Sequence, residues 1–250
     1  MRVAAVVPVR RQSTRVPEKA LVDIDGLPMF VHTCKRVELA ESVDRVYLAT
    51  DDVGIADMAT TYGISTIMTA TSHRNSSERA AEASTSIECD IIVNVQGDEP
   101  LLYPTHVDAL VTPMLQNPQL QVTIGVTRFR KRNSPGDIKA VIGKSNEVLY
   151  SSRNDIPCFY GQDSQEMWKL CFIVPFRKYV LQQYLVWEPG PLELAEDNHF
   201  LRLTENGISM TAIEIDGAKI SVDTEDDLLV VRKLMDEDEV KLRYLGPLGT

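Results

Sequence analysis

The sequence predicts an α/β fold in which a Rossmann-like, mainly parallel sheet is flanked by helices. Short apolar runs alternate with helical patterns through the first half of the chain, as expected of repeated strand–helix units. Runs that are apolar throughout indicate parallel strands, because helices cover both faces of such a sheet. We expect strands at residues 3–7, 45–49, 64–68 and 91–95, and helices at residues 28–39 and 53–62.

Two helices carry capping signals at their amino-terminal ends. Thr105 and Asp108, after the last of these strands, have the spacing of a capping box, in which a hydroxyl and a carboxylate satisfy the first helical N–H groups. Thr224 and Asp227 repeat the pattern before a helical stretch at residues 226–235. Both boxes predict a helix directly after a strand.

The second half of the sequence changes character and predicts a small lobe of mixed strands. Its strand-like pieces are joined by turn-rich segments such as residues 133–137, Asn-Ser-Pro-Gly-Asp. We expect one domain over residues 1–250 with an inserted lobe at about residues 129–190. Strands are expected at 121–129, 140–142 and 148–151, one apolar run at 167–175, and helices at 176–187 and 193–206.

Composition indicates a globular protein and argues against a nucleic-acid partner. With 250 residues, 44% of them hydrophobic, the chain can bury a full core. The formal net charge of -10, with two tryptophans and no basic stripe, argues against a nucleic-acid partner, because such surfaces neutralise backbone phosphate. Free nucleotides stay possible as ligands.

Cysteine usage and hydropathy predict a cytoplasmic protein with no membrane partner. The cysteines are far apart and form no C-x-x-C pair, which favours neither a zinc site nor a disulfide framework and fits a reducing cytosol. The first nine residues lack the apolar core and cleavage site of a signal peptide, and no apolar run approaches the roughly 18 residues of a membrane span.

A cationic loop follows the first predicted strand. Ligands of α/β sheets bind beyond the carboxyl ends of the strands, where residues 8–19 place four cations. Arginine forks and a mobile lysine suit phosphate oxygens, and two prolines limit the entropy lost when a ligand orders the loop. A solvated basic loop is the alternative. The cations are Arg10, Arg11, Arg15 and Lys19, with the hydroxyl donors Ser13 and Thr14 among them.

Two aspartates at the ends of strand-like pieces are candidate magnesium ligands. Asp98 follows the strand at residues 91–95, and the preceding Gly97 permits close backbone approach. Asp223 lies one residue before the predicted cap Thr224. Magnesium usually takes one or two protein carboxylates and completes its shell with substrate phosphates. Capping of the next turn is the alternative for Asp98, and stabilisation of the helix dipole is the alternative for Asp223.

Six short motifs stand in order along nearly the whole chain. They are residues 10–19 with Leu21, Gly26-Leu27-Pro28-Met29 with Val31-His32, Ala49-Thr50-Asp51-Asp52, residues 93–100, Tyr150-Ser151-Ser152-Arg153 with Ile156-Pro157, and Val222-Asp223-Thr224 with Asp227-Leu228. Together they resemble the 3-deoxy-manno-octulosonate cytidylyltransferases, or CMP-Kdo synthetases, and more distantly the other CMP-sugar-acid synthetases. The combination of Gln-Gly-Asp-Glu-Pro with the amino-terminal loop is specific.

The resemblance implies a nucleotidyltransferase fold of the glycosyltransferase-A-like type. It implies a magnesium-dependent enzyme that joins CMP from CTP to a sugar acid or related acidic acceptor and releases pyrophosphate. By matching position, Arg15, Lys19 and Asp98 would be catalytic, and Asp98 and Asp223 would hold Mg²⁺. The implied nucleotide-binding residues are Arg10, Ser13, Thr14, Arg15, Lys19, Ser77, Arg79, Gln96 and Asp98.

One nucleotide loop departs from the family pattern. Residues 75–79, Asn-Ser-Ser-Glu-Arg, stand where the family has Ser-Gly-Thr-Asp-Arg, a loop associated with the cytosine and the ribose. Arg79 and the acid Glu78 match in kind, whereas Ser76 replaces the glycine. An exposed helix cation is the alternative for Arg79.

The departures are larger where the family recognises its sugar. The family's His, Gly and Tyr become Leu170, Phe172 and Val174, and its Glu and Gln become His199 and Phe200. Apolar side chains leave sugar hydroxyls without partners, so we predict a different acceptor: a smaller or less hydroxylated acid, a modified ulosonate or a phosphonate. A structural histidine is the alternative for His199. The acceptor candidates are Gln96, Arg153, Leu170, Phe172, Val174, His199, Phe200 and Arg202.

The resemblance also implies a homodimer packed through the inserted lobe and the helices after Phe176. The apolar residues Val180, Leu181, Tyr184 and Leu185 fit such a contact or ordinary core packing, and Trp168 and Trp187 are expected in the core or at the interface.

Two other functions stay open. One is a nucleotidyl or glycosyl transferase that uses another nucleotide, which the full cationic loop disfavours for a diphosphate-sugar donor. The other is a non-catalytic nucleotide-binding or scaffold protein, which would have no need for so many converging charges. Rates with other nucleoside triphosphates and loss of pyrophosphate release on Asp98→Ala would separate these classes.

Overall fold

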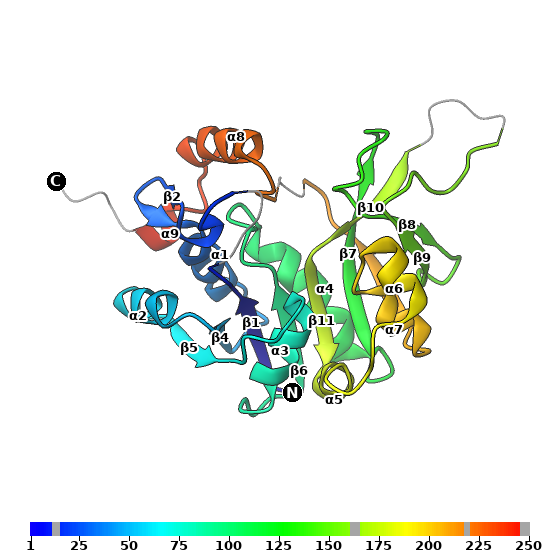
Figure 1. The fold of residues 1–250 in the computed structure, drawn as a ribbon, viewed down its shortest axis with the longest axis horizontal. Helices are drawn as coiled ribbons and strands as arrows, with labels where there is room; N and C mark the ends of the chain where they lie inside the picture. The colour runs from blue at the N-terminus through cyan, green and yellow to red at the C-terminus, as the bar shows by residue number, and fades with distance from the viewer. Residues whose placement is uncertain (12–15, 161–165, 218–220, 246–250) are drawn as a thin grey trace.

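A single mixed sheet with helices on both faces organises the protein (Figure 1). The structure is a computed structural model and describes residues 1–11, 16–160, 166–217 and 221–245. The strand order is β5-β4-β1-β6-β11-β7-β10-β8-β9. A further strand, β12, pairs with β7 and is not part of this order. The predicted α/β class and the helix-flanked sheet are confirmed.

The amino-terminal half of the sheet is parallel. Its strands are β1 (Val3–Pro8), β4 (Arg45–Thr50), β5 (Ser65–Met68) and β6 (Ile91–Val95). In β1 every residue is buried, and Val6 aligns with Tyr47 of β4 on one side and with Asn94 of β6 on the other. Because these strands are parallel, their carboxyl ends lie at one edge of the sheet, where the predicted ligand loops follow.

Alternate residues of β1 face two separate cores. Val3, Ala5 and Val7 join a cluster with α1, α2 and α4, whereas Ala4 and Val6 join a cluster with α3 and α5. This alternation explains why the strand is apolar at every position. The helices are α1 (Met29–Glu38), α2 (Val53–Thr61), α3 (Ser76–Ser84), α4 (Pro104–Gln116) and α5 (Lys178–Gln183).

The second half of the chain extends the same sheet. β11 runs antiparallel to β6, β7 and β10 pair antiparallel, and β8 and β9 form the far edge. Strands of the predicted lobe at residues 129–190 are therefore continuous with the main sheet. The strands of the second half of the chain are β7 (Val122–Phe129), β8 (Lys139–Ile142), β9 (Val148–Ser152), β10 (Met167–Cys171), β11 (Ile173–Arg177) and β12 (Met210–Glu214), of which β8 to β11 lie within the predicted lobe. A separate antiparallel pair joins β2 (Asp23–Ile24) to β3 (Leu27–Pro28).

Two predicted elements are each divided into two. The apolar run at residues 167–175 forms β10 and β11, which are separated by Phe172. The helix predicted at residues 193–206 is α6 (Pro191–Glu196) and α7 (Leu201–Glu205), because Asp197 adopts a left-handed conformation with φ of 45° that ends α6. Both breaks bring residues to the cleft described below.

The two capping predictions differ in outcome. The Thr224 box is confirmed: its side chain accepts from the backbone N–H of Asp227 at the start of α8 (Glu225–Asp236), and the Asp227 carboxylate accepts from the Thr224 N–H in return. The Thr105 box is wrong, since α4 begins with Pro104, whose fixed φ suits the first helical position. Asp108 instead accepts a hydrogen bond from the backbone N–H of Ser42 at 2.8 Å.

The carboxyl-terminal segment contacts the first helix, α1. Tyr244, on the short helix α9 (Leu242–Leu245), places its hydroxyl 2.7 Å from Nδ1 of His32 and 3.3 Å from Nε of Arg36. Arg36 is fully buried and donates to Asp238 at 2.5 Å. Residues about 200 positions apart in the sequence are thereby tied together beside α1.

Further predictions can be placed on this fold. All four cysteines, Cys34, Cys89, Cys158 and Cys171, lie in described segments and are free. Among the helices of the described ranges, none combines the length and apolar character needed to cross a membrane. Of the proposed dimer residues, Val180, Leu181 and Tyr184 are fully buried within the protomer, because α5 packs on the sheet, and Leu185 is exposed.

Candidate active site

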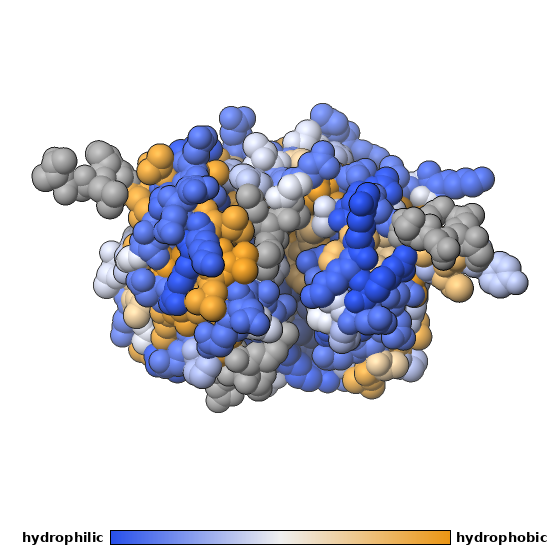
Figure 2. All heavy atoms as spheres, turned by 90° about the horizontal axis from the view of Figure 1, so that it is seen from above, coloured by the Kyte–Doolittle hydropathy of each residue, from blue (hydrophilic) through white to orange (hydrophobic). Residues whose placement is uncertain are grey.

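A cleft of about 340 Å³ lies beyond the carboxyl ends of β1 and β6. Figure 2 looks onto this side of the molecule, where a hollow separates the part that carries α8 from the part that carries β10. The loops after the two strands supply one part of its lining, and loops from the second half of the chain supply the rest. Lining residues include Pro8, Val9, Arg10, Lys19, His73, Arg74, Asn75, Ser76, Arg79, Gln96, Asp98, Arg153, Phe172, Asp197, His199 and Asp223.

Lys19 joins the two predicted metal ligands. Its ammonium lies 2.5 Å from Oδ2 of Asp98 and 3.7 Å from Oδ1 of Asp223, and it donates to the Val222 carbonyl at 2.7 Å. The backbone N–H of Val222 also donates to the Asp98 carbonyl at 3.0 Å. The segment before α8 is therefore held against the end of β6, which brings together three charged groups that sequence reasoning had singled out.

Gly97 allows the turn after β6 to lie close to the end of β1. A Cβ atom at this position would lie 2.7 Å from Cγ2 of Val9 and 3.2 Å from the Pro8 carbonyl oxygen. Contacts this short would force the β6 turn away from the loop after β1. Glycine therefore sets the position of the adjacent Asp98.

The carboxylate of Asp98 is suited to a cation beyond Lys19. Its Oδ1 atom is buried and has no hydrogen-bond partner within the described residues. A buried carboxylate oxygen without a partner is costly, and a bound cation removes that cost. Asp223 supplies a second, one-third-exposed carboxylate nearby. Two carboxylates plus substrate phosphates form the oxygen-rich set that magnesium prefers, so the residues present fit this ion.

Glu99 behaves differently from its neighbour Asp98. Burial is the main cause that raises the pKa of Glu99 to about 8, and the negative charge of Asp98 adds to the effect. Ser221 donates to Glu99 Oε1 at 2.5 Å, which anchors the segment before Asp223 to the same turn. Two adjacent carboxyl groups thus have different surroundings, and Asp98 is the one that lines the cleft.

The cationic loop divides between the cleft and the surface of α2. Arg10 is exposed and lines the cleft. Arg11 points elsewhere, with its guanidinium 2.6 Å from Asp52 and 2.7 Å from Glu18. Asp52 caps α2 by accepting from the Ile55 N–H, so Arg11 belongs to a local ion-pair cluster. The predicted contacts Ser13, Thr14 and Arg15 lie outside the described residues.

The loop before α3 forms another wall of the cleft. Asn75 caps α3 by accepting from the Glu78 N–H, which leaves Ser76 at the cleft surface. Arg79 also lines the cleft although it is 4% exposed, and it is held by Thr69 Oγ1 at 2.6 Å and by Asp51 at 3.3 Å. Ser77 differs from its prediction: it is fully buried and accepts from Asn94 Nδ2 of β6.

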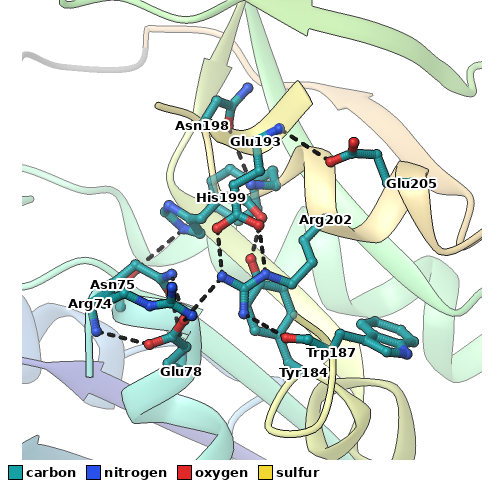
Figure 3. Close-up of polar contacts among 12 residues, drawn as sticks. Arg74, Asn75, Glu78, Tyr184, Trp187, Glu193, Asn198, His199, Arg202 and Glu205 are labelled. Carbon is teal, nitrogen blue, oxygen red and sulfur yellow. Dashed lines mark hydrogen bonds and ion pairs between the residues drawn. The ribbon is translucent and has the colours of Figure 1, made fainter. Parts of the chain in front are cut away.

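Arg202 lies beneath this wall in a network of buried charges (Figure 3). Its guanidinium is 1% exposed and lies 2.5 Å from Glu193 on α6 and 3.0 Å from Glu78 on α3. Glu78 in turn accepts from the backbone N–H of Arg74 at 2.8 Å. The predicted acceptor contact Arg202 is thus a link between α6, α7 and the loop before α3, rather than part of the cleft lining.

The other acceptor candidates separate by burial. Gln96, Arg153, Phe172 and His199 line the cleft. Leu170, Val174 and Phe200 do not: they are at most 1% exposed and belong to the core cluster that packs against α3 and α5. Leu170 and Val174 lie on β10 and β11, where successive side chains point to opposite faces of the sheet, and both are on the face that packs on the core. Phe200 precedes α7 and packs into the same core cluster.

Sequence reasoning missed the cleft residues Arg74 and Asp197, which precede α3 and stand at the break between α6 and α7. Asn75 also lines the cleft and belongs to the loop at residues 75–79 that the sequence had indicated, although it was not named as a contact. Arg74 directly precedes that loop, which was the available signal for it. The sequence predicted one continuous helix at residues 193–206, so it gave no reason to place Asp197 in the cleft.

Comparison with known proteins agrees with this geometry. A family model for cytidylyltransferases matches residues 4–215. The chain is 36% identical to a 3-deoxy-manno-octulosonate cytidylyltransferase of Chlorobium phaeobacteroides over 95% of this chain and 98% of that protein. It is also 36% identical to the protein of that name from Geobacter sulfurreducens, over 91% and 97% of the two chains. The chain belongs to the 3-deoxy-manno-octulosonate cytidylyltransferase family. It is a nucleotidyltransferase that uses CTP.

Solved structures support the family assignment and the fold. A CMP:2-keto-3-deoxy-manno-octonic acid synthetase complexed with CTP superposes with a TM-score of 0.90 at 32% identity, covering 95% of this chain and 99% of that chain. A cytidylyltransferase from Leptospira borgpetersenii, at 16% identity and a TM-score of 0.67, shares the fold. The cytidylyltransferase family predicted from the sequence motifs is therefore confirmed.

Proposed function

We propose that this cytidylyltransferase transfers CMP from CTP to a small acidic acceptor, with Mg²⁺ as cofactor and pyrophosphate as the second product. The observation that carries the proposal is the pairing of Asp98 and Asp223 around Lys19 at the cleft, with one buried Asp98 oxygen that no other described residue bonds. Relatives named for 3-deoxy-manno-octulosonate support a sugar-acid acceptor.

Asp98 and Asp223 would hold the magnesium ion. When bound, the ion supplies positive charge that polarises phosphoryl oxygens and offsets charge on the leaving group. The Oδ1 atom of Asp98, which has no hydrogen-bond partner in the described part of the chain, is the oxygen proposed to bind the ion, while Oδ2 keeps its contact with Lys19.

The cations of the first loop would orient and stabilise the triphosphate. An acceptor oxygen attacks the α-phosphorus of CTP, a new O–P bond forms, and the bond to the oxygen that bridges the α- and β-phosphates breaks. Lys19 stands where it can offset charge on the α-phosphate, and Arg10, with Arg15, is proposed to bind the pyrophosphate portion. Fixed charges of this kind lower the barrier without reorganising during the reaction.

Different walls of the cleft are proposed to bind the two substrates. Ser76 and Arg79 from the α3 side are proposed to contact the nucleoside, Arg153 is proposed to contact the acceptor, and Gln96 at the end of β6 is proposed to contact both. The Gln96 N–H donates to the Phe172 carbonyl at 3.3 Å, which holds the end of β6 beside the break between β10 and β11.

Incubation with CTP, Mg²⁺ and a panel of acidic acceptors tests the proposal. Phosphorus NMR should show one equivalent of pyrophosphate for each CMP adduct, and chelation by EDTA should stop both. ATP, GTP and UTP tested in parallel examine the alternative of another nucleotide. Turnover that favours one of these over CTP, or that continues in EDTA, would contradict the proposal.

We further propose that the enzyme is a homodimer. Exposed apolar side chains after α5 and along α6, namely Leu185, Val186, Leu192 and Leu194, offer a contact surface. Light scattering after size-exclusion chromatography should give twice the mass of 28.0 kDa. A monomer at micromolar concentration would contradict this assembly. The cytoplasmic location stays a prediction.

A further inference from the structure

Lys139, the first residue of β8, is a fully buried lysine that does not itself line the cleft. Its ammonium donates to the backbone carbonyls of Ser134 and Asp137, both at 2.8 Å, and to the carbonyl of Arg153. The carboxylate of Asp155 stands further away, at 3.9 Å. An ammonium has three N–H donors, so these carbonyls use all of them. Burial of a charged group is costly unless its donors are satisfied, and the three carbonyls meet that need.

The three carbonyls belong to two segments that supply cleft residues. The turn at residues 134–137 places Gly136 at the cleft, and Arg153, directly after β9, also lines it. Pairing between β8 and β9 ends where Lys139 aligns with Ser152. The ammonium therefore continues the connection between the two segments beyond the end of the strand pairing.

The side chain of Arg153 makes a second connection, on the cleft side. Its guanidinium donates to the carbonyl of Pro135 at 2.9 Å, which lies in the same turn. It also donates to the carbonyls of Glu196 and Asp197, at 2.8 and 2.7 Å, at the break between α6 and α7. Arg153 thus links two walls of the cleft, while its own backbone is held by Lys139.

Resting on the proposed CMP transfer, in which Arg153 contacts the acceptor, we infer that Lys139 is a positioning residue for the acceptor side of the cleft. Its ammonium fixes the backbone of Arg153 against the turn at residues 134–137, and this fixes the place of the guanidinium in the cleft. The nucleotide side does not depend on this link: Arg79 is held by Thr69, and Lys19 by Asp98.

Steady-state kinetics of Lys139→Met tests the inference. Methionine keeps an unbranched side chain and removes the three donors. The assay measures pyrophosphate release with CTP, Mg²⁺ and 3-deoxy-manno-octulosonate, the acid in the names of the relatives. We expect kcat/KM for the acid to fall by about 10- to 100-fold, as for a misplaced substrate contact, while KM for CTP changes by less than about twofold.

Arg177→Met is the matched control. Arg177 is also buried, at 7% exposure, and donates to three backbone carbonyls, those of Met114, Asn117 and Leu120. It aligns with Ile91, the first residue of β6, and so lies at the edge of the sheet opposite the cleft. This variant should lose stability and keep both kinetic constants.

Lys139→Gln is the second variant, since its amide retains two donors and should produce a smaller change in the same direction. An unchanged acceptor kcat/KM in Lys139→Met, equal rises in KM for both substrates, or the same selective loss in Arg177→Met would overturn the inference and leave CMP transfer standing. Failure of both Lys139 variants to fold, judged by circular dichroism, would show that the ammonium serves the core as a whole and would overturn it too. No pyrophosphate release by the unsubstituted protein would instead contradict the proposed transfer to this acid, and the inference with it.

Discussion

At the scale of single residues, Arg202 illustrates how a buried charge can organise a site that it does not touch. Its guanidinium contacts Glu193 and Glu78 and lies 4.4 Å from the ring centroid of Tyr184. Because Glu78 holds the backbone of Arg74, removal of Arg202 affects both stability and the wall of the cleft beside α3.

Substitution of Arg202 should therefore be costly. Arg202→Met leaves two buried carboxylates without their partner and should lower the free energy of unfolding by about 3–5 kcal/mol. The control Arg130→Met removes an ion pair with Glu166, 2.6 Å long, in which the arginine side chain is 82% exposed. It should change the free energy of unfolding by less than about 1 kcal/mol. Urea unfolding measures both. Equal effects would show that the Arg202 network contributes no more than a surface pair.

The neutral state of His199 predicts a pH dependence. Its pKa is about 4 in the folded protein, below the ordinary value of 6.5 expected in the unfolded chain. Between these values the unfolded chain binds more protons, so stability falls as pH decreases from 7 toward 4. The contribution between pH 7 and 5 should be about 1–2 kcal/mol. Unfolding of His199→Gln should show a flatter decline over this range, and parallel curves for the two proteins would contradict the assignment.

Sequence reasoning was correct about position where a charged side chain follows a buried strand, and the roles of these residues stay predictions. Lys19 and Asp98 follow β1 and β6, whose parallel pairing brings them together. Prediction was wrong for Leu170 and Val174, which face the core. Alignment to a motif identifies a position, whereas the packing of the strand decides which way its side chain points.

At the scale of elements, α8 connects helix capping with the proposed magnesium site. Thr224 caps this helix, and Asp223 immediately before it points toward Lys19. The cap therefore fixes the direction from which the second carboxylate enters the cleft.

Loss of the cap should affect stability and function together. Thr224→Ala should cost about 1 kcal/mol of unfolding free energy and raise the magnesium concentration needed for half-maximal pyrophosphate release. Thr60→Ala is a suitable control, because Thr60 lies on α2 and its hydroxyl donates only to the carbonyl of Ala56 one turn earlier in the described structure. A magnesium requirement that rises equally in both variants would contradict the connection.

Element boundaries show where local patterns are sufficient. β1 and β6 could be predicted because each is a short apolar run bounded by turn signals. The apolar run at residues 167–175 is continuous and carries no local sign of the break at Phe172. The left-handed turn after α6 falls on Asp197, and no glycine marks it in the sequence. At each break a carbonyl accepts from a residue far away in the sequence, Phe172 from the Gln96 N–H and Asp197 from the Arg153 guanidinium, which no local pattern can reveal. Both breaks supply cleft residues.

At the scale of the whole molecule, the carboxyl-terminal segment stabilises the first helix. Tyr244 meets His32 and Arg36, and Asp238 pairs with Arg36. Tyr244→Phe should lower the free energy of unfolding by about 1–2 kcal/mol, because it removes one hydroxyl shared by two buried groups. Tyr179→Phe, which removes an exposed hydroxyl bonded to Gln121, should have little effect. Comparable losses in chemical denaturation would argue against a stabilising role for this segment.

The central claim is that two strand ends and the segment before α8 form one magnesium-dependent site for CMP transfer. The most direct measurement is pyrophosphate release from CTP, with Mg²⁺ and the acceptor panel above, by Asp98→Asn and by the control Asp108→Asn. Asp98→Asn should lose about 100- to 1000-fold in rate, as expected when a fixed electrostatic group is removed, with no large change in unfolding temperature. Asp108→Asn, on α4 and away from the cleft, should keep the rate. Release by Asp98→Asn at the unsubstituted rate, with the same magnesium dependence, would contradict the account.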